Sequence, residues 1–243
     1  MGPRVVVVDG SVGLALAGAD HVGELLAETP ASSVVVPTGR TPIGVYEELA
    51  ARRRAGVLNT SQLTVVQLDE YLGLEPGDGR SLFRWMDLMF LEPLAIDPAR
   101  VLALPTDGDT EAGLAFDRAL EDRGGLDLAI LGLGANGHLG FNEPPTAADA
   151  GTRAVDLRPE TLEANASYWG DGVDVPRRAV TIGMRQLLAA RQILLLVAGA
   201  SKHAIVHAAI EGPVSPDVPA SFLQVAADRV TVIVDRAAWE GEA

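Results

Sequence analysis

Short, mainly apolar runs alternate along the chain with segments whose apolar residues recur at helical spacing. The runs lie at 5–8, 33–36, 63–68, 101–104, 126–131, 179–182, 193–198 and 230–234. A run without polar alternation is typical of a strand that is buried on both faces, which is the usual situation in a parallel sheet. Strands that alternate with helices predict an α/β protein: a three-layer, Rossmann-like, mostly parallel open sheet with helices on both faces.

The rest of the pattern indicates one unit rather than several. No internal repeat and no linker interrupts the 243 residues, so we expect a single domain over residues 1–243. Residues 145–177 are the exception to regular patterning, because they are polar and poor in apolar periodicity. A long irregular segment is typical either of a lid over an active site or of a solvated surface excursion, and the pattern favours neither.

The charge and the cysteine content narrow the class of protein. Nineteen basic and 33 acidic side chains give a net charge of −14, which argues against binding to nucleic acid or to an anionic membrane. An anionic ligand would therefore need a local cationic pocket. The chain has no cysteine, no signal-peptide pattern at its start and no apolar run near the ~20 residues of a membrane span. We expect a cytoplasmic protein, with homo-oligomer formation left open.

The glycine-rich stretch at 126–145 carries the strongest chemical signal. It reads L-D-L-A-I-L-G-L-G-A-N-G-H-L-G-F-N-E-P-P, so a buried strand ends in a loop whose glycines let the backbone turn tightly beside a ligand. The same loop contains G-x-G-x-x-G with Asp156 about 20 residues further on, as in dinucleotide-binding sites. That motif requires a helix at the third glycine, which the closing P-P pair opposes. We therefore favour acid–base chemistry by His138 and Glu143.

Two elements of the sequence are suited to binding an anion. The turn P-T-G-R-T-P at 37–42 follows a predicted strand and precedes a predicted helix, with Thr41 as an N-cap. Hydroxyls and a glycine at a helix N-terminus favour an anion, although an ordinary capped turn explains the same pattern. Lys202 lies in the first turn of a later predicted helix, where a cation is unfavourable unless an anion is bound.

Two pairs of polar residues are further candidates for chemistry. Asp69 and Glu70 follow the predicted strand at 63–68, where paired carboxylates suit acid–base work and a solvated turn is the alternative. His203 and His207 are spaced i, i+4 like metal ligands, but no carboxylate completes an H-E-x-x-H pattern. We therefore expect a surface histidine pair and no metal.

Several motifs, in order, resemble those of the glucosamine-6-phosphate deaminases, which share a fold with the 6-phosphogluconolactonases. The loop at 137–144, G-H-L-G-F-N-E-P, is similar to the deaminase signature G-H-x-x-F-N-E-P, whereas the lactonases have G-H-x-x-S. The stretches P-T-G-R-T-P at 37–42, D-E-Y-L-G-L at 69–74 and E-G-P-V-S at 211–215 resemble further deaminase motifs. The resemblance extends over nearly the whole chain and implies the same fold.

This resemblance implies an enzyme that couples aldose–ketose isomerisation to deamination, converting glucosamine 6-phosphate to fructose 6-phosphate and ammonia. It implies that Asp69 is the catalytic base and that His138 opens the sugar ring, oriented by Glu143 and also by Asn136. None of the implied steps requires a metal or an organic cofactor, and the expected partner is a small sugar phosphate. The phosphate is expected on a turn and a lysine, namely Thr38, Gly39, Arg40, Thr41 and Lys202.

Departures from the family pattern indicate a divergent member. Arg40 stands where the family usually has glycine, Asn136 stands where some members have aspartate, and Ser167 stands where the family has a phosphate-binding arginine. The alternatives are a related enzyme for another, even unphosphorylated, amino sugar, a 6-phosphogluconolactonase, or a sugar-phosphate sensor without catalysis. The F-N-E-P continuation argues against the lactonase, and the retained set of Asp69, His138 and Glu143 argues against the sensor.

Overall fold

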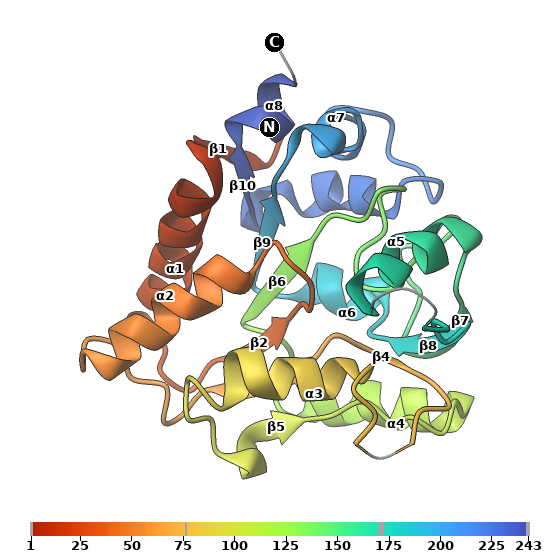
Figure 1. Cartoon of the computed structure of the whole chain (residues 1–243), viewed down its shortest axis with the longest axis horizontal. Helices are drawn as coiled ribbons and strands as arrows, with labels where there is room; N and C mark the ends of the chain where they lie inside the picture. The colour runs from red at the N-terminus through yellow and green to blue at the C-terminus, as the bar shows by residue number, and fades with distance from the viewer. Residues whose placement is uncertain (1, 76, 170–172, 242–243) are drawn as a thin grey trace.

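A seven-stranded parallel sheet forms the centre of the computed structural model, which describes residues 2–75, 77–169 and 173–241 (Figure 1). The strand order is β1-β10-β9-β6-β2-β3-β5, and every neighbouring pair is parallel. This arrangement confirms the predicted mostly parallel α/β sheet. The strands are β1 (Arg4–Val8), β2 (Ser33–Val36), β3 (Thr64–Gln67), β5 (Val101–Leu102), β6 (Leu128–Gly132), β9 (Gln192–Val197) and β10 (Val230–Asp235).

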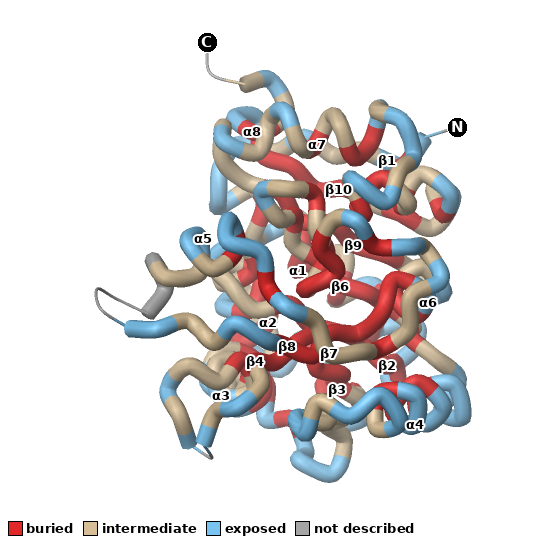
Figure 2. The backbone as a smooth tube through the Cα atoms, turned by 90° about the vertical axis from the view of Figure 1, so that its right-hand side faces the viewer, coloured by how far each residue is buried: buried red, intermediate tan, exposed pale blue. Residues whose placement is uncertain are grey.

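Helices cover both faces of this sheet. Successive residues of a strand point to opposite faces, so each strand contributes side chains to both layers of helices. The face that carries Val34 and Val36 is covered by α1 (Gly10–Glu28), α2 (Ile43–Arg54), α3 (Leu82–Met86) and the π-helical turn η1 (Asp87–Leu91). The face that carries Val35 is covered by α4 (Thr110–Asp122), α6 (Met184–Ala189), α7 (His203–Ile210), the 3-10 segment η4 (Pro219–Arg229) and α8 (Arg236–Glu240). Figure 2 shows the strands as the buried centre between these layers.

A second, three-stranded antiparallel sheet was not anticipated from the sequence. Its order is β4-β8-β7, with β4 (Asp69–Tyr71), β8 (Arg178–Thr181) and β7 (Arg153–Asp156). The apolar run at 63–68 ends as β3, and the chain then enters β4 at Asp69, which lies opposite Thr181. β8 corresponds to the predicted apolar run at 179–182. β4 and β7 are only three or four residues long and pair with distant segments, so local periodicity carries little trace of them.

The segment at 145–177 is more regular than its composition indicates. It contains β7 and the helix α5 (Pro159–Trp169), which lies beside the second sheet (Figure 1). The side chain of Ser167, at the position where the family has an arginine, lies outside the described part of the structure. None of the helices within the described ranges is long and apolar enough to cross a membrane.

The turn after β2 differs in detail from the prediction. α2 begins at Ile43, with Pro42 rather than Thr41 at the N-cap position and no side-chain cap. The hydroxyl of Tyr46, in the first turn of α2, donates a hydrogen bond of 2.8 Å to the carbonyl oxygen of Pro37. This buried hydrogen bond fixes the turn to α2, and Thr41 lines the pocket.

Candidate active site

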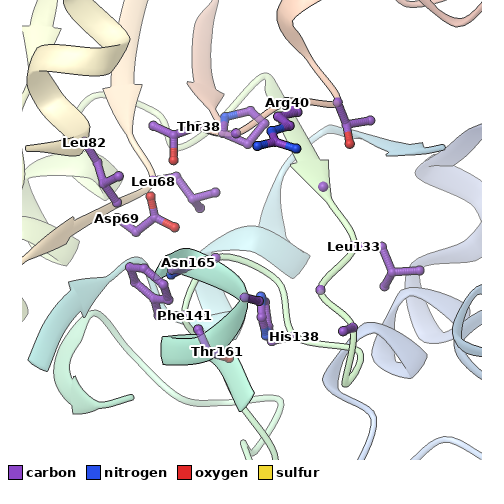
Figure 3. Close-up of a pocket in the computed structure, with 18 of the residues that line it drawn as sticks. Thr38, Arg40, Leu68, Asp69, Leu82, Leu133, His138, Phe141, Thr161 and Asn165 are labelled. Atoms are coloured by element: carbon purple, nitrogen blue, oxygen red, sulfur yellow. The ribbon is translucent and has the colours of Figure 1, made fainter. Parts of the chain in front are cut away.

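A pocket of about 320 Å³ opens beyond the carboxyl ends of the central strands (Figure 3). Its walls come from the turn after β2, from β4, from the glycine-rich loop after β6, from the turn after β9 and from α5. Parallel strands bring their carboxyl ends to one edge, which explains why segments far apart in sequence meet there. The pocket brings together eight of the nine predicted site residues: Thr38, Gly39, Arg40, Thr41, Asp69, Asn136, His138 and Lys202.

Asp69 is a buried carboxyl group in one wall of this pocket. Only 6% of the residue is exposed, and its Oδ1 has no hydrogen-bond partner among the described residues. The apolar side chains of Leu82 and Phe141 line the wall around it (Figure 3). Burial, together with the neighbouring charge of Glu70, raises the pKa of Asp69 to about 7. This carboxyl group can therefore both release and bind a proton near neutral pH.

The adjacent carboxylate, Glu70, has a different environment. It accepts hydrogen bonds from the backbone N–H groups of Tyr71, Leu82 and Phe83, at 2.8 to 2.9 Å. It also accepts from two side chains, Gln67 and Ser81. Two of the backbone donors are at the N-terminus of α3, where negative charge is stabilised. Glu70 therefore holds α3 against β4, and the two neighbouring acids have separate roles.

His138 supplies an imidazole to the same space, as Figure 3 shows. Its Nδ1 lies 2.7 Å from Oδ1 of Asn136, and its own backbone N–H donates to the same oxygen at 3.2 Å. A backbone N–H can only donate, so the atom of Asn136 that it faces must be the carboxamide oxygen. Nδ1 therefore carries the proton of the neutral ring, and Nε2 presents a lone pair.

The imidazole is held neutral and in close contact with the backbone. Burial and the charge of Lys202 lower the pKa of His138 to about 4, so the ring carries no charge at neutral pH. The ring packs directly on Gly134, where an added Cβ would lie 2.3 Å from Nε2 and Cδ2. The backbone N–H of Gly134 also donates to the carbonyl oxygen of His138 at 3.0 Å. Only glycine leaves room for the ring in this position.

Glu143 lies behind His138 rather than in the pocket wall. Its Oε1 is 3.7 Å from Nδ1 of His138, beyond hydrogen-bond distance, so the direct bond to the ring comes from Asn136. The carboxylate accepts hydrogen bonds from the backbone N–H of Arg158, at 2.6 Å, and from the hydroxyl of Thr161. Glu143 thus connects the imidazole with the start of α5, and its negative charge is available to an imidazolium.

Lys202 and the turn after β2 contribute the polar and cationic part of the lining. The Nζ of Lys202 donates to the carbonyl oxygen of Leu133 at 2.7 Å, and burial lowers the pKa of this amine. Arg40 is exposed and also lines the pocket. Gly39 has φ +110°, a conformation that favours glycine, so the turn carries no side chain at that point. Two cations beside a hydroxyl-bearing turn can hold an anion against the net negative charge of the protein.

Among the lining residues that were not identified from the sequence as site residues are Tyr71, Trp85 and Asn165. Asn165 of α5 donates from Nδ2 to the hydroxyl of Tyr71 at 2.8 Å, and the ring of Tyr71 contacts that of Phe141. Trp85 of α3 also lines the pocket. Tyr71 belongs to the family-like motif at 69–74, but only the folded chain brings it together with Asn165. No group of three potential metal ligands is present among the described residues.

Comparisons with known proteins cover most of the chain. The profile of the family described as glucosamine-6-phosphate isomerases/6-phosphogluconolactonase matches residues 13–232. The chain belongs to this family. A glucosamine-6-phosphate deaminase of Rhodopirellula baltica is 42% identical over 223 residues, which cover 90% of this chain and 88% of that protein. One from Streptomyces coelicolor is 41% identical over 240 residues, with 96% and 90% covered.

Solved structures extend the likeness to the fold. A monomeric glucosamine-6-phosphate deaminase superposes with a TM-score of 0.91 at 33% identity, with 97% of this chain and 98% of that chain covered. A 6-phosphogluconolactonase of Trypanosoma brucei superposes with a TM-score of 0.75 at 18% identity, with 99% of each chain covered. The second likeness concerns the fold alone. Together these comparisons confirm the family and the fold that the motifs predict.

Proposed function

We propose that this protein is a glucosamine-6-phosphate deaminase, which converts glucosamine 6-phosphate and water to fructose 6-phosphate and ammonia in cytoplasmic amino-sugar metabolism. The observation that carries the proposal is the pairing of Asp69 and His138 around one pocket. A carboxyl group with a pKa of about 7 and an imidazole with a free Nε2 border the same space. Isomerisation needs a base at carbon and a separate group that handles protons on oxygen, and these two residues match those needs.

Ring opening is the step assigned to His138. Its Nε2 accepts the proton of the anomeric hydroxyl and returns it to the ring oxygen, so that the C1–O5 bond breaks and an aldehyde forms. The ring is cationic between these transfers. The hydrogen bond to Asn136 keeps the proton on Nδ1, and the carboxylate of Glu143 at 3.7 Å stabilises the transient imidazolium.

Isomerisation and loss of ammonia are assigned to Asp69. Its carboxylate removes the proton from C2, while a proton of the neighbouring ammonium group moves to O1, and an enolamine forms. Asp69 then returns its proton to C1, so that the double bond moves to C2 and nitrogen. Water adds to this ketimine, the C2–N bond breaks, and ammonia leaves as the ketone forms. The raised pKa of Asp69 suits both the removal and the return of the proton.

The phosphate is assigned to the turn after β2 and to the two cations beside it. Thr38 and Thr41 supply hydroxyls, and Lys202 and Arg40 supply positive charge at the same pocket. Arg40 provides a guanidinium in a chain that has Ser167 in place of the family's arginine. Bidentate guanidinium–phosphate contacts make arginine an effective replacement.

The test is the release of ammonia from a panel of substrates. Glucosamine 6-phosphate should give ammonia and fructose 6-phosphate in equal amounts, with much higher kcat/KM than unphosphorylated glucosamine. Mannosamine 6-phosphate tests the configuration at C2, and 6-phosphogluconolactone tests the lactonase alternative. Turnover of unphosphorylated glucosamine alone would contradict the assigned phosphate site. Hydrolysis of the lactone without any release of ammonia would contradict the proposed function itself.

A further inference from the structure

Lys202 reaches the pocket from a sharp turn that follows β9. Gly199 has φ +92°, and its carbonyl oxygen accepts a hydrogen bond of 2.9 Å from the backbone N–H of Lys202. The single 3-10 turn η3 (Ala200–Lys202) then leads directly into α7. A turn of this length has few internal hydrogen bonds, so contacts from neighbouring elements set its direction.

The main such contact comes from Asp235, a buried carboxylate that takes no part in the proposed chemistry. Asp235 is the last residue of β10, the strand next to β9, and it is 8% exposed. Both of its oxygens lie 3.0 Å from the backbone nitrogen of Gly199. Its Oδ1 also accepts from the backbone N–H of Ala238 at 2.8 Å and so caps α8. The carboxylate thus fixes the first N–H of the turn that carries Lys202.

A second contact from the same helix fixes the other end of this turn. His203, the residue after Lys202, has its Nδ1 3.2 Å from the carbonyl oxygen of Ala238. The turn is therefore held at both ends by the start of α8: Asp235, its N-cap, binds Gly199 before Lys202, and Ala238 contacts His203 after it. On the pocket side, Nζ of Lys202 is bonded to Leu133, in the loop that carries His138. A shift of the turn would move the ammonium group relative to that loop.

We propose that Asp235 is a positioning residue for the phosphate-binding Lys202, acting through the backbone of Gly199 from outside the pocket. The inference rests on the proposed function, because it takes Lys202 as the cation that meets the sugar phosphate. Asp235 lines no part of the pocket, so its loss weakens phosphate binding while Asp69 and His138 keep their places in the pocket. The effect is expected in KM and not in kcat.

The test variant is Asp235→Ser. Serine is a good N-cap and keeps an oxygen for α8, but its shorter side chain does not reach Gly199. KM for glucosamine 6-phosphate should rise by about tenfold, the factor expected from one lost charge-assisted hydrogen bond, with kcat changed by less than about twofold. Asp109→Ser is the matched control, because Asp109 caps α4 through the N–H of Glu111 and does not line the pocket. It should leave both constants unchanged.

A double-mutant comparison separates positioning from general loosening of the fold. In a Lys202→Met background, Asp235→Ser should have no further effect on kcat/KM, because its only route to the substrate has been removed. A tenfold effect that persists without Lys202, or a loss confined to kcat, would overturn the inference.

Binding of glucitol 6-phosphate, which can neither open a ring nor lose ammonia, gives a readout that does not depend on catalysis. Calorimetry should show about tenfold weaker binding by Asp235→Ser than by the wild type. If the wild type releases no ammonia, the proposed function fails, and this binding experiment still tests Asp235. Equal affinities of the two proteins for glucitol 6-phosphate would then overturn the inference by themselves.

Discussion

Replacing Asp69 by asparagine should abolish turnover and at the same time stabilise the folded protein. Asparagine keeps the shape of the side chain but cannot accept the C2 proton, so kcat should fall by about 10²–10⁴-fold, the usual contribution of a general base. Sugar-phosphate binding should be retained, because the phosphate is assigned to residues on other walls of the pocket. The same buried position makes the ionised carboxylate unfavourable, and the neutral amide avoids that penalty.

The size and the pH dependence of the stabilisation follow from the pKa of Asp69. Its folded value of about 7 lies above its ordinary value of 3.8, so the native state holds this proton more tightly than the unfolded chain. The stability associated with that proton is fully present below about pH 4 and is lost as pH rises through about 7. At about 1.4 kcal/mol for each pKa unit, the complete loss is up to about 4 kcal/mol. Asp69→Asn does not suffer this loss.

Urea unfolding of the two proteins at about pH 4.5, 6 and 8 measures the difference directly. The difference in the free energy of unfolding should be smallest, about 1 kcal/mol, at the lowest pH, and the variant should be more stable by up to about 4 kcal/mol at the highest. Asp149→Asn, at an exposed carboxylate, is the control and should show no such trend. A variant whose advantage over the wild type does not grow between these pH values would refute the reasoning. In the wild type, kcat/KM should rise with pH through about 7, as Asp69 ionises.

Three other substitutions test the surroundings of the site. Gly134→Ala should displace the ring of His138 and lower kcat at least about tenfold, while circular dichroism shows that folding is retained. A fully active variant, or an equal loss of kcat in the control Gly79→Ala, would contradict this prediction. Glu70→Gln should lower the free energy of urea unfolding by about 2–4 kcal/mol, because it leaves buried donors unpaired; a change below about 0.5 kcal/mol would show that they find other partners. His207→Gln should be less stable than the wild type only at low pH. Hydrogen bonds to the carbonyl oxygen of Trp239 and to Glu211 raise the pKa of His207, so the stabilisation is present below about pH 6.5 and is lost as pH rises through the folded pKa. A difference in melting temperature that is the same at about pH 6 and 8.5 would refute this assignment.

The sequence pattern was a good guide to the main sheet and a poor one to the second sheet. The inner strands β2, β6 and β9 are buried between helices and therefore have apolar runs, which are visible without any tertiary information. The strand at 153–156 has neither burial on both faces nor a clear alternation, so nothing local marks it. The apolar run at 63–68 also hides the change from one sheet to the other, because β3 and β4 are separated only by Leu68.

The candidate site divides in the same way. The sequence predicted which residues reach the pocket. Thr38, Asp69, His138 and Lys202 all follow predicted strands, and parallel strands end at one edge of the sheet. Sequence reasoning made Glu143 the main partner of the imidazole, but the nearer oxygen in the folded chain belongs to Asn136.

The sequence by itself thus determined the sheet, the edge at which its loops meet and the residue types delivered there. Packing alone decided that Oδ1 of Asp69 is buried with no hydrogen-bond partner in the described part of the chain. It also decided that Glu70 accepts hydrogen bonds from the start of α3 and that a helix from 145–177 closes one wall of the pocket. The physical reason is that apolar periodicity records the burial of each segment on its own. The pKa of a carboxyl group and the partner of an imidazole depend instead on distances between segments that meet only in the folded state.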